Sequence, residues 1–86
     1  MSRHIDNLVR MANRIGDFFC HQPDQAAGIE GVANHIEKFW EPRMRHQILD
    51  FLAEHPDGVT PGGVVMQNIV RQALNQYRDR LRPEAG

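Results

Sequence analysis

Apolar residues recur at three- and four-residue intervals along most of this 86-residue chain, which is the spacing of amphipathic α-helices. Four such stripes predict four helices, over about residues 4–20, 25–40, 42–54 and 61–81. No stretch alternates apolar and polar positions as a strand does, and no internal repeat is present. We therefore expect an all-α fold, a small bundle of about four short helices that forms a single domain over residues 1–86, with a frayed tail from about residue 82.

Proline and capping residues mark the ends of these helices. Pro23 disfavours helix at the residue before it, and Asp24 is placed to cap the second helix. Pro42 either breaks or kinks the chain or opens the third helix as its first residue. The segment 55–58 is a strong turn signal, and the segment 60–61, a threonine followed by a proline, predicts the cap and the first residue of the fourth helix.

Gly28 and Gly31 weaken the second predicted helix, because each glycine costs about 1 kcal/mol relative to alanine inside a helix. Two explanations stay open. Either another helix approaches these positions closely, or the first turns of the second helix are irregular until something packs on them.

Charge and cysteine content narrow the class of protein. Ten Lys and Arg residues stand against eleven Asp and Glu residues, whereas a nucleic-acid module of this size usually carries a clear basic excess. Lys38 is the only lysine, and the other basic residues are arginines. This preference for arginine over lysine fits a protein interface, because arginine suits planar and bidentate contacts, but a G+C-rich genome explains it equally well.

The lone Cys20 excludes a disulfide within the chain. Without a signal-like N-terminus or an apolar stretch of membrane-spanning length, the chain is expected to be cytoplasmic.

The residues needed for catalysis or metal binding do not occur in the required patterns. The glycines lack P-loop spacing, one cysteine cannot hold an iron–sulfur cluster, and no two histidines lie three or four residues apart. We expect partly exposed surface histidines. Cys20 is expected to be a buried or half-buried thiol rather than a nucleophile, because His21 points to another helix face. The sequence therefore predicts a non-catalytic protein that binds no metal and no cofactor.

Two stretches contain more aromatic and arginine residues than a bare bundle requires. Phe18 and Phe19 are adjacent, hence about 100° apart on a helix, so either one of them is an exposed docking anchor or the helix is buried over a wide arc. The segment 35–46 contains the only tryptophan, Trp40, followed by Pro42 and two arginines. Trp, Arg and Met are enriched at interface centres, which favours docking. The alternative is that Trp40 caps the core and the arginines are solvated.

The same stretches resemble the delta subunit of the cytosolic NAD-dependent, molybdenum-containing formate dehydrogenases. The resemblance rests on the opening IDNLVRMANRIGDFF, on the central GIEGVANHIEKFWEPRMR, and on a short helical tail after the Thr-Pro turn. It covers residues 4–54 well and the fourth helix loosely. Its most specific part is the run FWEPRMR with NHI upstream, since such a run is rare in ordinary bundles.

This resemblance implies an accessory role. In the family, a large catalytic subunit holds a bis-pterin molybdenum or tungsten cofactor, and other subunits carry iron–sulfur clusters, FMN and the NAD site. The delta-type subunit has no redox centre and is associated with assembly or stability of the complex, including insertion of the molybdenum cofactor. Its expected partners are therefore the catalytic and other subunits of formate dehydrogenase. The positions matched to the family, as contact or fold-defining residues, are Phe18, Phe19, His35, Phe39, Trp40, Pro42, Arg43, Met44 and Arg45.

Two other classes of protein stay open. One is a stand-alone regulatory or nucleic-acid-binding module that reads its target with the third helix, which the balanced charge disfavours. The other is a homodimeric bundle in which Trp40 and one of Phe18 or Phe19 are buried between two copies. A homo-oligomer of the isolated chain is therefore an open alternative, and neither nucleic acid nor membrane is among the expected partners.

Overall fold

The structure is a computed structural model that describes the backbone of residues 2–83 and the side chains of residues 4–83. Its helices are α1 (Ser2–Phe19), α2 (Gln25–Phe39), α3 (Pro42–Glu54), α4 (Asn68–Gln76) and α5 (Arg78–Leu81). Within the described range there is no strand, only an isolated antiparallel bridge between Val59 and Val65. The predicted all-α fold is confirmed. The expected frayed tail falls mainly on residues 84–86, which lie outside the described residues.

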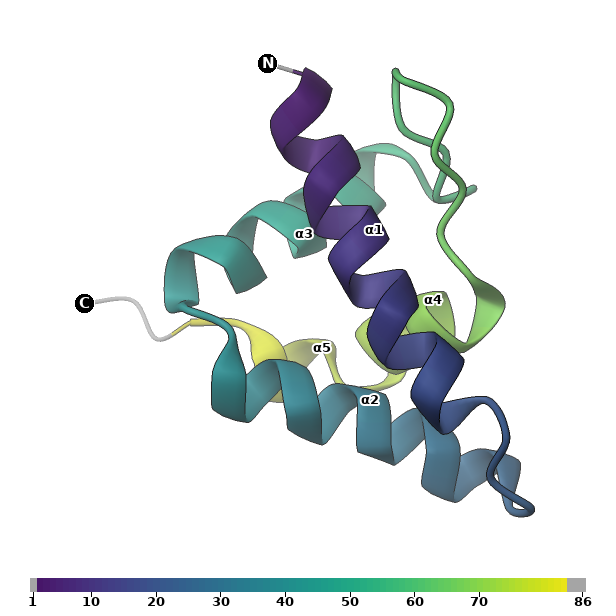
Figure 1. Ribbon diagram of the computed structural model, residues 1–86. Helices are drawn as coiled ribbons and strands as arrows, with labels where there is room; N and C mark the ends of the chain where they lie inside the picture. Colours follow the sequence, from purple (N-terminus) through teal and green to yellow (C-terminus); the bar gives the residue numbers. More distant parts are fainter. Residues whose placement is uncertain (1, 84–86) are drawn as a thin grey trace.

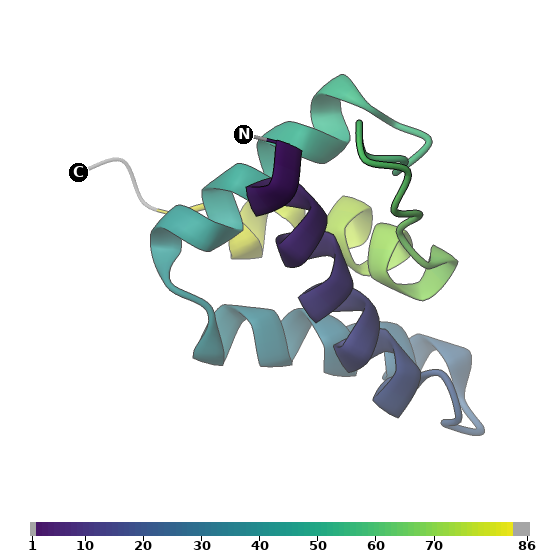
Figure 2. The ribbon, with the colours of Figure 1, turned by 45° about the horizontal axis from the view of Figure 1, so that its top comes forward.

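Helix α1 lies across the front of the molecule in both ribbon views, with α4 and α5 behind it, α2 toward the bottom and α3 to the left of its first turns (Figures 1 and 2). Helix α4 packs against both α1 and α2, and α5 packs against α2 and α4. Helices α1 and α2 join at the turn over residues 20–24 and diverge from it (Figure 1). Helix α1 therefore contacts three of the other helices, α2, α3 and α4.

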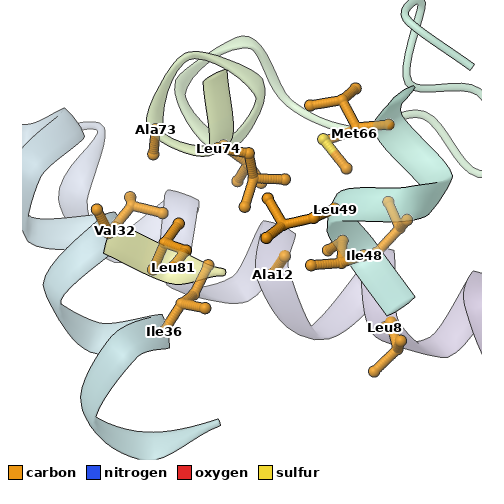
Figure 3. Packing of buried hydrophobic residues seen from close by; sticks show 14 of the residues in the cluster. Leu8, Ala12, Val32, Ile36, Ile48, Leu49, Met66, Ala73, Leu74 and Leu81 are labelled. Carbon is orange, nitrogen blue, oxygen red and sulfur yellow. The ribbon is translucent and has the colours of Figure 1, made fainter. Parts of the chain in front are cut away.

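The core collects apolar side chains from all five helices and from the loop before α4 (Figure 3). The members labelled in Figure 3 are Leu8, Ala12, Val32, Ile36, Ile48, Leu49, Met66, Ala73, Leu74 and Leu81. Each predicted stripe supplies its inward face, as Leu8, Val9 and Ala12 do for α1. Burial of a leucine or isoleucine side chain contributes about 1.5–3 kcal/mol, so the stripe residues hold the helices together.

Two of the predicted helix ends are set by single residues. Asp24 caps α2 as predicted, because its Oδ1 accepts a hydrogen bond of 3.0 Å from the N–H of Ala26. Pro42 is the first residue of α3, which is one of the roles that the sequence left open to it. The predicted turn at 55–58 is present, and its last residue, Gly58, adopts a φ of +73°.

The fourth helix begins later than predicted, because the chain at Thr60 forms a tight turn instead of a helix start. The Thr60 N–H donates to the Val64 carbonyl oxygen at 2.9 Å, and the Val64 N–H donates to Thr60 Oγ1 at 3.0 Å. Gly63 adopts a φ of +88°, outside the right-handed helical region. Thr60 therefore closes a turn, and α4 begins at Asn68. Tyr77, with a φ of −111°, separates α4 from the short α5.

The loop before α4 is fastened to α1 by side-chain hydrogen bonds. Asn13 donates to the Val65 carbonyl oxygen at 2.9 Å through Nδ2, and its Oδ1 accepts from the Gln67 N–H at 2.9 Å. The Gln67 side chain in turn donates to Asp17 Oδ1 at 2.6 Å. Helix α1 is thus bonded to residues at least 50 positions later in the chain.

Candidate functional site

The nine residues that the sequence singled out divide into three groups in the structure. Phe18, Phe19, His35 and Phe39 line one surface groove; Trp40 and Met44 belong to the core or pack against it; Pro42, Arg43 and Arg45 lie at the start of α3. The structure therefore brings four of the nine together, and these four define the candidate site.

The groove lies between α1 and α2 and has two parts that share two lining residues. One part, of about 440 Å³, is lined by Arg14, Ile15, Phe18, Phe19 and His35. The other part, of about 250 Å³, is lined by Phe19, Gly31, Asn34, His35, Lys38 and Phe39. Phe19 and His35 line both parts, so the two parts are neighbours on the surface where α1 meets α2. We call this surface the α1/α2 groove.

The end of α1 rests directly on α2 at two glycines. A Cβ atom on Gly31 would overlap the ring of Phe19, and one on Gly28 would lie 2.7 Å from the Phe19 carbonyl oxygen. Of the two explanations that the sequence left open for these glycines, close approach is therefore correct. Because Phe19 turns toward α2, its neighbour Phe18, about 100° around the helix, points outward.

Two pairs of neighbouring aromatic rings line the groove. The rings of Phe18 and Phe19 meet edge to face with centroids 4.9 Å apart, and those of His35 and Phe39 are 4.7 Å apart. Phe18 is 70% exposed and Phe39 is 71% exposed. One of the two adjacent phenylalanines is thus exposed, and the alternative of burial over a wide arc is wrong. Large apolar rings gathered on one surface mark sites of interaction.

Positive charge flanks these aromatic rings. Arg14 and Lys38 line the groove with exposed side chains, and His35, which lines both parts, is half-buried. No Asp or Glu among the described residues lines either part of the groove. The groove thus joins aromatic walls to a rim, formed by Arg14 and Lys38, that carries positive charge only.

Trp40 lies in the core rather than on the surface. Its side chain is 7% exposed, and its backbone N–H closes α2 with a hydrogen bond of 3.0 Å to the Ile36 carbonyl oxygen. Met44 is half-buried and packs against the same core. In this fold the indole is not accessible as a docking anchor, and the alternative interpretation, in which Trp40 covers the core, describes the structure. Trp40 therefore belongs to the core and Met44 packs against it, and a role for either in partner binding stays a prediction.

At the start of α3, one arginine faces inward and one faces solvent. Arg45 is half-buried, and its Nη1 donates to the Leu81 carbonyl oxygen at 3.3 Å, which joins α3 to the end of α5. Pro42 and Arg43 are exposed. Arg45 therefore links α3 to α5 within the fold, and a role for Pro42, Arg43 and Arg45 in partner binding stays a prediction.

The prediction of a buried or half-buried thiol at Cys20 is wrong. Helix α1 ends one residue earlier, so Cys20 begins the turn that leads away from the core, and its exposed Sγ donates to the Asp17 carbonyl oxygen at 3.2 Å. The histidines are on the surface as predicted, with only His35 half-buried. Within residues 4–83, no group of three or more His, Cys, Asp or Glu side chains is placed to hold a metal ion.

The sequence did not single out four groove residues, Arg14, Ile15, Asn34 and Lys38. The available signal was helical spacing. Arg14 lies four residues before Phe18, and Lys38 lies three residues after His35, so each cation shares a helix face with an aromatic ring of the groove. Which faces of α1 and α2 meet depends on their packing, which spacing within one helix does not give.

These features define a small helical protein whose distinctive surface is an exposed aromatic groove with a basic rim, a kind of surface typical of proteins that bind other proteins. None of its described helices is long and apolar enough to cross a membrane. The chain belongs to the family of the NADH-dependent formate dehydrogenase delta subunit FdsD, whose family model matches residues 7–74. No curated protein and no solved structure matches the chain. The predicted family is confirmed, and the match includes both walls of the α1/α2 groove.

Proposed function

We propose that this chain is a non-catalytic accessory subunit of a cytoplasmic NAD-dependent formate dehydrogenase. Its role is to support assembly, stability or molybdenum-cofactor insertion by docking on the catalytic and other subunits. Membership of the delta-subunit family supports the association with a formate dehydrogenase. The observation that carries the docking role is that Phe18 and Phe39 are both exposed and line the two neighbouring parts of the α1/α2 groove.

The cofactors belong, in this proposal, to the partner subunits: bis-pterin molybdenum or tungsten, iron–sulfur clusters, FMN and NAD. The residues that line the α1/α2 groove supply aromatic rings and cations, and within the described part of the chain they include neither a carboxylate nor a thiol. Such a set is suited to binding a protein surface, because aromatic and arginine side chains are enriched at protein interfaces.

The exposed rings provide a physical reason to dock. Burial of an exposed phenylalanine side chain contributes about 1.5–3 kcal/mol, and the free chain leaves two such side chains, Phe18 and Phe39, in water. Part of this free energy offsets the loss of rotational and translational freedom on binding. Burial of the two exposed rings therefore contributes to the free energy of partner binding, and complementary charges at the rim contribute further.

The test is co-expression of the affinity-tagged full chain with the other formate dehydrogenase subunits, alongside the same subunits without it. We expect the chain to co-purify with the complex, or, if it acts only in maturation, the complex made without it to contain less molybdenum and oxidise formate more slowly. The proposal is wrong if the chain does not co-purify and the complex made without it has its full molybdenum content and activity. The stoichiometry of the purified complex separates a permanent subunit from a maturation factor.

A further inference from the structure

We infer that the α1/α2 groove accepts an acidic amphipathic helix of a partner subunit, whose apolar face covers Phe18 and Phe39 and whose carboxylates pair with Arg14 and Lys38. This inference rests on the proposed function, because it takes the partner to be another formate dehydrogenase subunit. It adds the chemistry of the segment that binds.

The shape of the groove calls for an occupant with more than one apolar anchor. Phe18 lines only one part of the groove and Phe39 only the other, so a segment that covers both rings extends over both parts. From Gly31 to Phe39 the groove follows about 12 Å of α2, at a rise of 1.5 Å per residue. About two turns of helix cover that length. Apolar side chains three, four or seven residues apart then meet both aromatic pairs, as in other helices that bind in grooves.

The charges at the rim select an acidic occupant. Within residues 4–83, the side chains of Arg14 and Lys38 form no hydrogen bond and no ion pair, whereas Arg80 is held by Glu37 at 2.9 Å. No carboxylate from the described part of this chain lines the groove to neutralise them. A partner segment that brings carboxylates to both cations is therefore favoured, and a segment with lysines or arginines at those positions is opposed.

A second copy of this chain is a poor occupant for the same reason. In a twofold dimer the same patch meets itself, so the groove of one copy would face the groove of the other. Arg14 and Lys38 would then lie near the same cations of the second copy, with no lining carboxylate from the described residues to separate the like charges. The aromatic walls favour such a dimer, but the rim opposes it.

Photo-cross-linking in the co-expressed complex tests the identity of the occupant. p-Benzoylphenylalanine replaces Phe18 or Phe39 in the full chain, and Val65, an exposed apolar residue outside the groove, serves as the matched control position. We expect positions 18 and 39 to cross-link to one partner segment with apolar residues at helical spacing and at least two Asp or Glu residues. We expect position 65 not to reach that segment.

The outcomes separate this inference from the proposed function. Cross-links to a neutral or basic segment, to a second copy of the chain, or to nothing while the chain still co-purifies in full, overturn the acidic helix and leave the accessory role standing. If the unsubstituted chain does not co-purify, and the complex made without it has its full molybdenum content and activity, the accessory role is overturned and the inference with it.

Charge reversal tests the rim separately. Arg14→Glu should raise the Kd for the partner complex at least tenfold, the order of magnitude expected for a close charge pair at an interface. Arg82→Glu makes the same change in net charge at an exposed site outside the groove and should leave the Kd within about twofold. Replacing the cross-linked Asp or Glu of the partner by Lys should restore binding to the Arg14→Glu chain. Equal effects of the two substitutions, or no rescue, contradict the pairing.

Discussion

The α1/α2 groove and the start of α3 are linked by two adjacent aromatic residues with opposite surroundings. Phe39 lies in the groove and faces solvent, whereas Trp40 lies in the core. Trp40 follows the last helical residue of α2 with an extended backbone, φ −88° and ψ 138°, so its side chain leaves the direction that the helix gave to Phe39. By composition the segment after Phe39 is the better docking candidate, since it holds Trp, Met and Arg side chains.

The comparison teaches that side-chain direction, not residue type, separates the exposed groove from the core here. The four groove residues that the sequence singled out lie on two different helices, and they become one surface because α1 ends on Gly28 and Gly31 of α2. The residues after Phe39 follow one another in the chain, yet Trp40 and Met44 face the core while Arg43 faces solvent.

The largest expected effect is on the free energy of unfolding, and it should differ between substitutions at Trp40 and at Phe39. Trp40→Ala should lower the free energy of unfolding by about 3–5 kcal/mol, because it empties a buried site in the core. Phe39→Ala should change it by no more than about 0.5 kcal/mol, because that ring is exposed. Urea denaturation followed by circular dichroism measures both changes. If the alanine variant does not fold, Trp40→Phe against Phe39→Ala keeps the contrast measurable, and equal losses would contradict it.

The second prediction concerns partner binding, for which the exposed rings of the α1/α2 groove are expected to matter most. Phe18→Ala and Phe39→Ala should each weaken binding to the purified partner complex by about 2 kcal/mol or more, roughly thirtyfold in Kd, as expected for an aromatic anchor. Val65→Ala removes an exposed apolar side chain outside the groove and should leave the Kd unchanged. Biolayer interferometry with the immobilised chain gives the three Kd values. A loss as large for Val65→Ala would mean that the groove is not the contact surface.

The third prediction concerns the contact that builds the groove. Gly28→Ala should lower the free energy of unfolding by about 1–3 kcal/mol, because its Cβ meets the Phe19 carbonyl oxygen, a backbone atom that moves only with α1. Gly31→Ala should cost less, because its Cβ meets the Phe19 ring, which can rotate away. Its main effect should be weaker partner binding. Thermal denaturation and the binding assay of the previous experiment distinguish the two glycines, and a stabilised Gly28→Ala chain would exclude close backbone approach.

The smallest expected effect compares the two arginines at the start of α3. Arg45→Met should lower the free energy of unfolding by about 1 kcal/mol, because it removes the hydrogen bond to the Leu81 carbonyl oxygen. Arg43→Met should change stability by less than about 0.5 kcal/mol, since that side chain is exposed. Urea denaturation of the two variants under the same conditions provides the comparison. An equal loss at Arg43 would indicate that the Arg45 bond contributes nothing specific.

The parts of the fold that local chemistry determines were predictable from the sequence. Asp24 and Pro42 set the starts of α2 and α3 through groups in their own neighbourhood, and both helices begin where expected. The stretch from Thr60 was not predictable in the same way. A Thr-Pro pair fits a helix start and a turn equally well, and the turn observed here includes a positive φ at Gly63 and is fastened by Asn13 from far back in the chain.

The candidate site was predictable only in part. The angle between adjacent residues on a helix indicates that one of Phe18 and Phe19 can face outward, but which one depends on the position of Gly31 in another helix. Arg14 and Lys38 resemble ordinary solvated cations until α1 and α2 are packed together. Local pattern therefore suggested the aromatic residues, and tertiary packing was needed to assemble them with their charges.

The hydrogen bonds from Asn13 couple formation of the α1/α2 groove to folding of the chain up to Gln67. One wall of the groove is α1, and a helix of this kind takes most of its stability from tertiary packing, here including bonds to Val65 and Gln67. The wall is therefore in place only once the chain has folded as far as Gln67. A partner that binds the groove binds the folded state alone, and by mass action it stabilises that state by about 2.7 kcal/mol at a free concentration of 100 times its Kd. The melting temperature of this chain should consequently rise with the concentration of its partner.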